Sequence, residues 1–339
     1  MSLAAETTVS RSDLAALADS ALTGAGFATR TAAVLTEAAL FAEDRGRPEV
    51  GVTHLLDYLR AAESGSLNPA PAPVLTRVAP GLISCSADKG PFHTGFDAAF
   101  GDLVEAARSL GVVAFVQSEA FASGQLGWFT ERLASAGLAA VGAVNSNALL
   151  STAPGTGRVL GTNPLAYSFP SGAGRVVTVD QASSATAYVN IRRAAEAGES
   201  IPEGWAVDAD GRPATDPVAA LTGALLPFGG YKGANIAWLV ELVATMSGAN
   251  WSVDAPPFDA GPECPSVGMF LLGVDLTKLA PAGPGRIGAH LERIAGLGIR
   301  PPGSPRAEPR AAFTVADPVL ATLREYAARA PHTPGAETP

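Results

Sequence analysis

GLISCSADKGPFHTGFDAAFGDLVEAARSLGVVAFVQSEAFASGQLGWFTERLASAGLAAVGAVN, residues 81–145, is the stretch that decides the fold class. Short apolar runs at 81–86, 112–117 and 139–145 are typical of buried strands. Between them, apolar residues recur at helical spacing over 97–110 and 126–136. Because strands and helices alternate, the sequence predicts an α/β domain.

Upstream of this stretch, the first 65 residues are predicted to form a helical cap with little strand signal. Ser10 or Ser12 can cap a first helix, which Gly24 and Gly26 end. Further helices are predicted over 31–44 and 52–64. A Pro-rich connector at 68–73 then leads into the α/β region.

Downstream, strands are predicted at 165–169, 176–180 and 269–274, and a long helix over 233–247. The helix is expected to bury a face made of Ile236, Leu239, Val240, Leu242 and Val243. Residues past about 330 are expected to form a loose tail. We therefore divide the chain into an N-terminal helical region (1–75) that packs with the C-terminal segment, an α/β nucleotide- and substrate-binding region (76–300), and the C-terminal segment with its tail (301–339).

Composition excludes several classes of protein. The 339 residues contain 23 Lys and Arg against 32 Asp and Glu, a net charge of −9, whereas nucleic-acid binders carry a basic face. Two cysteines cannot form a disulfide scaffold. No apolar run is long enough to span a membrane, and the N-terminus lacks a signal core. We therefore expect a cytoplasmic protein with reduced cysteines that binds neither nucleic acid nor membrane.

Two classes of site have no support in the sequence. The four histidines are His54, His93, His290 and His332, and no two lie three or four residues apart. The sequence therefore predicts no metal site. It also contains no G-x-S-x-G motif, so a serine hydrolase is unsupported.

Two glycine-rich segments invite comparison with phosphate-binding loops. GPGRIG (283–288) matches the dinucleotide-binding glycine pattern, but Pro281 and Pro284 break the tight turn that this pattern needs. We interpret it as a Gly/Pro connector. GGYKG (229–233) places Lys232 among three glycines before the long helix, where backbone amides and the ammonium can meet an anion. A flexible turn with a solvated lysine explains the same residues equally well.

Polar residues also gather where two predicted strands begin or end. GTNP (161–164) leads into one strand, and Asp180 ends the next and is followed by QASSAT. Small and hydroxylated residues in such places are typical of a ligand-contacting rim. Turn chemistry alone can also explain them.

Five motifs occur in an order that resembles the malate/L-lactate dehydrogenase family. They are LGTNPLAYSFP (160–170), VTVDQASS (177–184), IPEGWAVDADGRPATDP (201–217), GALLPFGGYKG (223–233) and GMFLLGVD (268–275). The resemblance extends over about residues 10–305. The family includes ureidoglycolate, sulfolactate and diketogulonate dehydrogenases and reductases of cyclic imino acids.

The resemblance implies more than the residue pattern does. It implies an α/β, non-Rossmann nucleotide-binding fold without the glycine fingerprint, NAD or NADP as cofactor, and a homodimer. Thr162 and Asn163 fall at the rim of the relatives' nicotinamide site. The positions where relatives contact NAD(P) correspond to Ser146, Asp180, Gln181, Ala182 and Lys232.

The sequence departs from the family at its substrate-binding positions. Relatives read R-G-x-x-S-H-G-x-x-R where this chain reads RGRPEVGVTH (45–54), so Val50 replaces a histidine and His54 replaces a carboxylate-binding arginine. In a second motif, H-x-G-x-x-G, Ala122 replaces the histidine that acts as acid/base in part of the family. Val and Ala cannot donate the proton that carbonyl reduction requires, and imidazole lacks the bidentate fork of arginine.

These departures define the catalytic candidates. His54 lies one helical turn after Val50, and His93 lies on a predicted loop, so either can replace the missing acid, with Asp180 orienting a histidine or a water. His93 is equally well explained as a surface-loop histidine. Val50 makes the pocket corner apolar, which predicts a ligand with an apolar or aromatic part. This prediction fails if Val50 is turned into the core, away from any cavity.

Three functions remain open on this evidence. The first is an NAD(P)-dependent oxidoreductase with altered catalytic residues, acting on an unusual 2-oxo acid or a cyclic imino acid, for which a protonated imine lessens the need for a general acid. The second is a non-redox enzyme that uses the nucleotide pocket for NAD or a related ligand. The third is a non-catalytic homologue that serves as a partner subunit. A divergent family member of this kind also suits secondary metabolism.

Overall fold

A seven-stranded mixed sheet forms the centre of the protein. The structure is a computed structural model that describes residues 5–153, 155, 157–301 and 309–329. The strand order is β2-β3-β4-β11-β5-β6-β7. Only β3 and β4 pair in parallel, and the other neighbours are antiparallel. The strands are β2 (Val74–Ala79), β3 (Leu82–Ser86), β4 (Val112–Ala120), β11 (Val267–Asp275), β5 (Leu138–Val144), β6 (Leu165–Pro170) and β7 (Val176–Gln181).

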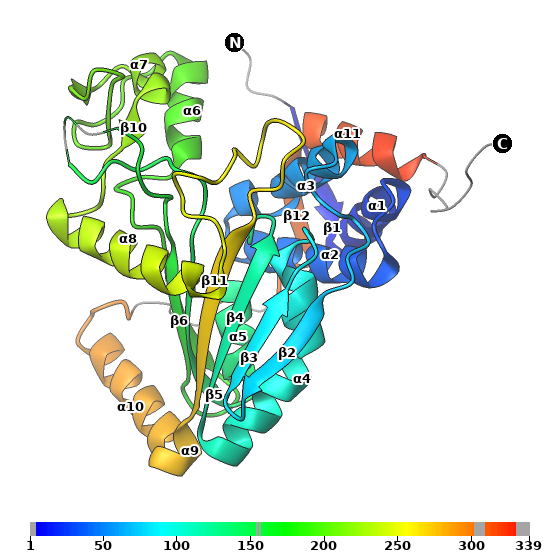
Figure 1. The fold of residues 1–339 in the computed structure, drawn as a ribbon, viewed down its shortest axis with the longest axis vertical. Coiled ribbons are helices and arrows are strands. Elements are labelled where there is room, and N and C mark those ends of the chain that lie inside the picture. Colours follow the sequence, from blue (N-terminus) through cyan, green and yellow to red (C-terminus); the bar gives the residue numbers. More distant parts are fainter. Residues whose placement is uncertain (1–4, 154, 156, 302–308, 330–339) are drawn as a thin grey trace.

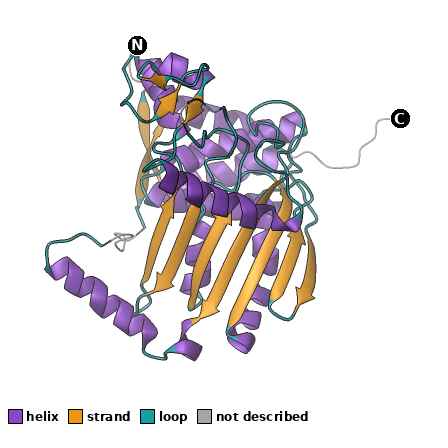
Figure 2. Cartoon of the chain, turned by 60° about the vertical axis from the view of Figure 1, so that its left-hand side comes forward, coloured by secondary structure: helices purple, strands orange, loops and turns teal. Residues whose placement is uncertain are grey.

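One face of the sheet is covered by α4 (Phe92–Leu110) and α5 (Gly127–Ser135), which lie behind the strands in Figure 1. Between them and the sheet is the main core, which contains Phe96, Phe115 and Trp128. On the other face, α8 (Tyr231–Ala244) crosses the strands near one end of the sheet, as Figure 2 shows. The predicted α/β class is therefore confirmed, and the sheet is not the parallel sheet of a Rossmann fold.

A second layer of helices joins the two ends of the chain. It contains α1 (Arg11–Gly24), α2 (Thr29–Asp44), the short helix η1 (Pro48–Val50), α3 (Val52–Ser64) and α11 (Asp317–Ala327). Ser10 caps α1, as its side chain accepts a hydrogen bond of 3.1 Å from Asp13 N. Leu14, Leu59 and Leu320 meet in the core of this layer.

The N-terminal region is not purely helical, which corrects the sequence prediction. Residues 6–10 form β1 (Glu6–Ser10), which pairs antiparallel with β12 (Ala312–Ala316). The two strands are about 300 positions apart in the chain, so no local pattern could reveal the pairing. The expected tail past 330 lies outside the described residues.

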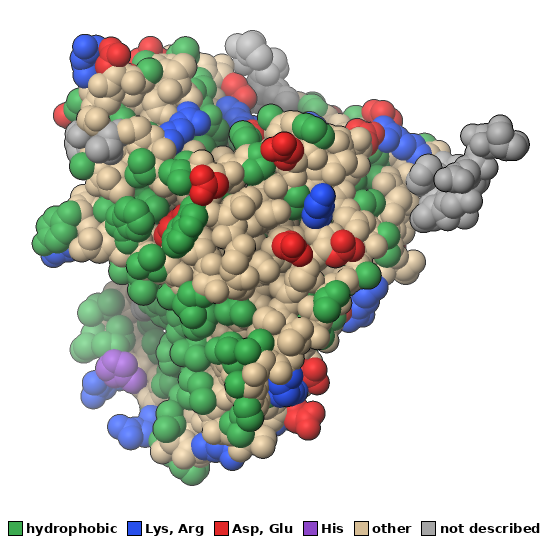
Figure 3. Space-filling view, in the orientation of Figure 1, with side chains coloured by type: hydrophobic (Ala, Val, Ile, Leu, Met, Phe, Trp, Pro, Cys, Tyr) green, Lys and Arg blue, Asp and Glu red, His purple; other side chains and the backbone are tan. Residues whose placement is uncertain are grey.

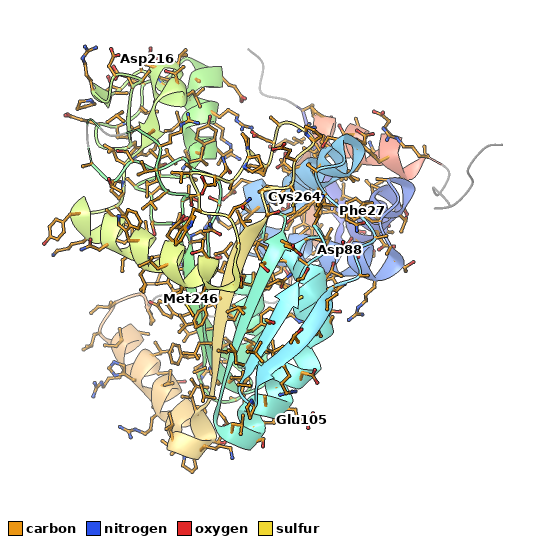
Figure 4. All side chains as sticks on the ribbon, in the orientation of Figure 1. Phe27, Asp88, Glu105, Asp216, Met246 and Cys264 are labelled. Carbon is orange, nitrogen blue, oxygen red and sulfur yellow. The ribbon has the colours of Figure 1, made fainter. Side chains whose placement is uncertain are left out.

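A small lobe follows β7. It consists of α6 (Tyr188–Ala197), α7 (Pro217–Thr222) and a sheet of β8 (Ala206–Val207), β9 (Pro213–Ala214) and β10 (Ala224–Leu225). Its own core contains Leu150, Ile191 and Leu225. Asp216, labelled in Figure 4, caps α7 by accepting a hydrogen bond from Val218 N at 2.9 Å. The sequence analysis did not predict the elements of this lobe.

The segment GPGRIG is a helix start, and its interpretation as a connector is wrong. It begins α10 (Gly283–Gly296), which follows the short α9 (Leu276–Leu279). Pro284 occupies the first turn, where a missing N–H costs nothing. Figures 1 and 2 both show α10 extending away from the sheet as an arm.

The apolar face predicted for the long helix is correct for Val240, which is buried, and wrong for Leu239 and Leu242. In α8 the buried positions include the small residues Ala234, Ala237 and Ala244, whereas Leu239 and Leu242 are 50% and 54% exposed. Small residues let the helix lie close to β5 and β11, so the large side chains are turned outward. Figure 3 shows hydrophobic side chains on α8 and below it, over the open face of the sheet, and Figure 4 places Met246 just after the end of α8.

Candidate active site

The segment between α2 and α3 is shaped by a buried carboxylate. Glu43 Oε1 accepts a hydrogen bond of 2.9 Å from Val52 N, at the start of α3. A Cβ on Gly51 would lie 2.3 Å from the same oxygen, so glycine is required there. Burial raises the pKa of Glu43, against the lowering effect of the Val52 hydrogen bond. Sequence analysis missed Glu43, although an acidic residue on the apolar side of a predicted helix was a usable signal.

His54 stands in the first turn of α3 and is paired with an acid. Its Nδ1 lies 2.9 Å from Asp57 Oδ2, and its ring meets Tyr58 edge-on, with centroids 4.9 Å apart. The Tyr58 hydroxyl donates a hydrogen bond of 2.9 Å to the carbonyl oxygen of Ala122. Burial raises the pKa of Tyr58, so its hydroxyl stays protonated. The edge of the imidazole that faces away from Asp57 lies near Gly124. A Cβ built on Gly124 would be 3.6 Å from His54 Cδ2.

A small cavity lies beside His54. Val50 lines this cavity, so its side chain is not turned into the core. It stays a prediction that the ligand has an apolar or aromatic part next to Val50. Tyr58 and His93 contribute polar groups and aromatic rings to the wall. The complete lining is Leu35, Ala38, Ala39, Val50, Gly51, His54, Leu55, Tyr58, His93, Gly124 and Gln125.

His93 is neither on a loop nor at the surface, which corrects both interpretations of it. It lies in the first turn of α4, which begins five residues earlier than predicted, and it is 2% exposed. Its ring packs against Trp128 and Phe129. Burial, followed by the charges of His54 and Arg132, lowers the pKa of His93 to about 3. His93 is therefore a neutral imidazole at physiological pH.

Asp180 is the residue before last in β7 and contacts the start of α5. Its Oδ2 accepts a hydrogen bond of 2.8 Å from Gly127 N, at the start of α5. Burial raises the pKa of Asp180, while the Gly127 hydrogen bond, Arg47 and Arg45 oppose this effect. Residues 124–127 therefore separate Asp180 from the cavity that His54 lines.

Two arginines of the RGRPEV segment surround this acid, and sequence analysis did not propose them. Arg45 forms an ion pair with Glu131, and its guanidinium lies 3.2 Å from the centre of the Phe41 ring. Burial lowers the pKa of Arg45, although the nearby Glu131 offsets part of this effect. Arg47 Nε donates to Glu49 Oε1 at 2.6 Å. Both guanidinium groups near Asp180 are thus already paired with a glutamate.

The residues predicted to bind the nucleotide lie at the adjoining ends of β6 and β7. Ser183 N donates to the carbonyl oxygen of Thr162 at 2.7 Å, which places Thr162 and Asn163 beside Gln181 and Ala182. A Cβ on Gly161 would lie 2.4 Å from Ser146 Oγ and 2.5 Å from Asn163 Oδ1. The structure therefore brings these residues together around Gly161.

Asn163 is buried, with φ of 39°, and its side chain is anchored by a second buried acid. Its Nδ2 donates to Glu241 Oε2 at 2.8 Å, and Glu241 also accepts from Ser252 N and Ser252 Oγ, both at 2.6 Å. Asn163 Oδ1 is buried without a partner. Glu241 was missed in the sequence, although a single acid among the apolar residues of WLVELVAT (238–245) was a usable signal.

Lys232 is the last of the residues predicted to bind the nucleotide. It is exposed in the first turn of α8, which begins before the predicted start. Phe228 N donates to the carbonyl oxygen of Ser183 at 3.0 Å, so the glycine loop lies against the end of β7. A Cβ on Gly233 would lie 2.1 Å from Phe228 O, and the preceding Gly229 and Gly230 both have positive φ.

A nicotinamide nucleotide is a good chemical match for these predicted nucleotide-binding residues. The open backbone at Gly229 and Gly230, the unpartnered Asn163 Oδ1 and the ammonium of Lys232 suit a ligand with amide, ribose and phosphate groups. The described residues contain no group of three or more His, Cys, Asp or Glu that could hold a metal ion. Within the same residues, no helix is long and apolar enough to cross a membrane.

The chain is similar to known proteins over most of its length. Residues 9–310 match the sequence model of a family described as malate/L-lactate dehydrogenase. A Δ1-pyrroline-2-carboxylate reductase of Pseudomonas fluorescens is 35% identical over 255 residues, covering 75% of this chain and 76% of that protein. A (2R)-3-sulfolactate dehydrogenase (NADP+) of Chromohalobacter salexigens is 33% identical over 325 residues, covering 92% and 95%. The solved Δ1-piperideine-2-carboxylate reductase of Pseudomonas syringae superposes with a TM-score of 0.87 and 31% identity, covering 94% of this chain and 99% of that one.

Proposed function

Because this chain belongs to the malate/L-lactate dehydrogenase family, we propose that it is an NAD(P)-dependent oxidoreductase that acts on a small imino or 2-oxo acid. The observation that carries the proposal is the position of Asp180–Ala182 at the end of β7. Asp180 contacts Gly127, in the loop that borders the cavity. The residues that follow Asp180 lie beside Gly161 and beside the loop that carries Lys232. Substrate-binding and nucleotide-binding groups therefore adjoin at one strand end.

The nucleotide would be held by the residues around Gly161 and by Lys232. Ser146, Thr162 and Asn163 would contact the nicotinamide end, and Lys232 would contact a phosphate. When bound, the nucleotide supplies or accepts a hydride. NAD and NADP are both candidates for the nucleotide, and a cytoplasmic location stays a prediction.

The transfer of a proton to the substrate is assigned to the residues that line the cavity beside His54. Since Val50 and Ala122 carry no transferable proton, His54 is the acid we propose, with Asp57 stabilising its protonated form. His93 is excluded as the acid because its pKa of about 3 leaves it neutral. Asp180 would hold the α5 terminus in place and can accept a proton, because its pKa is raised.

The proposal is tested by calorimetric titration of the purified protein with NADH and NADPH. Cyclic imino acids and 2-oxo acids are then added one at a time, and the loss of nicotinamide absorbance is followed. We expect micromolar binding of one nucleotide and turnover of at least one substrate class. Binding without turnover of any substrate would favour the non-redox function. Absence of binding to the folded protein would favour a non-catalytic partner subunit.

We also propose that two copies form a homodimer through the open sheet face. This face presents half-buried Phe270 and Leu272, and the adjoining α8 exposes Trp238, Leu239 and Leu242. Contiguous apolar surface of this kind is typical of an interface between subunits. Sedimentation should give twice the chain mass of 34.2 kDa, and L239K/L242K should reduce it to the monomer mass. A wild-type monomer at micromolar concentration would contradict this proposal.

A further inference from the structure

Asp180 lies near two arginines, yet both of them are paired with other acids. The positive charges of Arg45 and Arg47 act on its carboxylate. The guanidinium of Arg45 is taken by Glu131, and that of Arg47 by Glu49. In the part of the chain that the structure describes, Asp180 has no ion pair, and its carboxylate accepts one hydrogen bond, from the start of α5. This acid is therefore unpaired although cations are close to it.

The side chain of Arg45, directly after α2, is firmly held. Its Nη2 pairs with Glu131, and its Nη1 donates to the carbonyl oxygen of Phe41 at 3.2 Å. The guanidinium also covers the Phe41 ring. The side chain is only 15% exposed, so water screens its charge little. Which neighbouring acid pairs with this charge therefore depends on where each carboxylate is held.

Glu131, on α5, is held within reach of Arg45 by a chain of hydroxyl groups. Thr178 Oγ1, on β7, donates to Glu131 Oε2 at 2.8 Å. This uses the only proton of that hydroxyl, so Ser168 Oγ, 2.9 Å away, donates to Thr178 in turn. Thr130 Oγ1 lies 2.8 Å from Ser168 Oγ, and both residues are completely buried. The chain thus fixes one oxygen of Glu131 and leaves the other for Arg45.

Asp180 is fixed by a different donor. It lies two residues after Thr178 in β7, so the two side chains are on the same face of the strand. A Cβ on Gly127 would lie 3.2 Å from Asp180 Oδ2 and 3.2 Å from Thr178 Cγ2, so both side chains reach the start of α5. Asp180 accepts from the backbone N–H of Gly127, whereas Thr178 donates to Glu131. The fold therefore holds two acids close together and gives the cation to one of them.

We infer that Glu131 is a positioning residue that holds the guanidinium of Arg45 and thereby leaves the Asp180 carboxylate unpaired and able to bind a proton. The inference rests on the proposed function, in which Asp180 can accept a proton, and it names the group that keeps this acid available. An ion pair with Arg45 would stabilise the charged form of Asp180 and so oppose proton binding.

Titration of Asp180 itself tests the inference without any substrate. The full chain is labelled with carbon-13 at the side-chain carboxyl of aspartate, and the Asp180 signal is the one missing in D180N. Glu131→Gln keeps the size of the side chain but removes its charge, so Arg45 is left to act on Asp180. We expect Asp180 to titrate about one pH unit lower than in the wild type. Titration at the wild-type pH or above it would overturn the inference.

A second substitution shows whether the effect passes through Arg45. Arg45→Met removes the cation but keeps an unbranched side chain beside Phe41, so it should move the titration of Asp180 upward. General damage to packing would not shift the titration in opposite directions in E131Q and R45M. A double variant E131Q/R45M that titrates as low as E131Q would overturn the inference. If thermal unfolding shows that one single variant does not fold, the direction of the shift in the other decides.

Glu105→Gln is the matched control, because it removes the same charge from an exposed position near the far end of α4, which Figure 4 labels. It should leave the titration of Asp180 unchanged, and a shift equal to that in E131Q would overturn the inference. The other charges near Asp180 stay constant in all these variants. Arg47 keeps its pair with Glu49, and β6, which pairs with β7, contains no Asp, Glu, Lys, Arg or His.

Failure of this inference can be told apart from failure of the proposed function. If the wild type turns over neither imino nor 2-oxo acids, the proposed function fails, and the titration still reports on Glu131. If the wild type turns over a substrate, we expect kcat of E131Q to be lower by about 10-fold, the factor that corresponds to one pH unit, with nucleotide affinity unchanged. If E131Q instead keeps both the wild-type kcat and the wild-type titration of Asp180, the inference is overturned and the proposed function stands.

Discussion

Asp180 Oδ2 accepts a hydrogen bond of 2.8 Å from the backbone N–H of Gly127. The contact joins the end of β7 to the start of α5, so the strand that carries the positions proposed for the nucleotide is tied to the loop that borders the cavity. Gly127 has little room for a larger residue, because a Cβ there would lie 3.2 Å from the same oxygen. A displacement of Asp180 would therefore move both halves of the site.

Asp180→Asn is expected to preserve the fold and reduce turnover. The amide oxygen of Asn can still accept from Gly127 N, but the side chain can no longer take up a proton. We expect kcat to fall about 100-fold, which is the usual size of a proton-transfer contribution. Steady-state kinetics and circular dichroism of the two proteins are the measurements. Unchanged kcat would show that the charge of Asp180 has no part in the reaction.

His54→Gln tests the proposed acid. Gln keeps a polar side chain in the cavity but cannot transfer a proton, so we expect kcat to fall by about 100-fold or more. Asp57→Asn should cause a smaller loss, because it weakens the support for a protonated His54 without removing the imidazole. A loss in H54Q no larger than that in D57N would contradict the assignment.

Lys232→Ala tests the nucleotide-binding group. Removal of one exposed cation beside a phosphate should weaken NADH or NADPH binding by about 10-fold, with the difference shrinking at high salt, because salt screens exposed charges. Lys278→Ala is a matched control, since Lys278 is also exposed but lies on α9, on a different part of the fold. Equal effects of the two substitutions would argue against a site at Lys232.

Glu43 should make the protein less stable as pH rises. Its pKa is raised on folding, so the folded state binds this proton more tightly than the unfolded chain does. The stabilising contribution of protonation is therefore complete at low pH and is lost as pH rises through the folded pKa. In Glu43→Gln this loss is absent, so the stability of E43Q relative to wild type should increase between pH 5 and pH 8. Urea unfolding at both values measures it, and a constant difference would contradict the prediction.

Glu241→Leu should destabilise the fold strongly. Ser252 N and Ser252 Oγ would lose their acceptor in a buried place, and Asn163 Nδ2 would keep only its hydrogen bond of 2.9 Å to the carbonyl oxygen of Ala237. Each unsatisfied donor costs about 1–3 kcal/mol, so we expect a loss of about 3 kcal/mol or more in the free energy of unfolding. Glu196→Leu, at an exposed position of α6, is the control and should change stability by less than about 0.5 kcal/mol. Similar losses in both variants would contradict the role of Glu241.

Much of the fold was predictable where local pattern and tertiary structure agree. The capped helix after Ser10 and the strands and helices of residues 81–145 were predicted because burial of one face imposes its period on the sequence. β1 and β12 escaped prediction, since a short edge strand depends on a partner far along the chain. The buried face of α8 was predicted only in part, because close packing buries its alanines beside Val240 and leaves Leu239 and Leu242 exposed.

The sequence by itself determined the α/β class and the order of the family motifs. These are properties of residue identity and local period, which require no partner. Only the tertiary structure decided that His93 is buried and neutral, that Asp180 meets Gly127, and that Arg45 pairs with Glu131. Burial and hydrogen bonding depend on which distant segments meet, and that information is not contained in any single stretch of the chain.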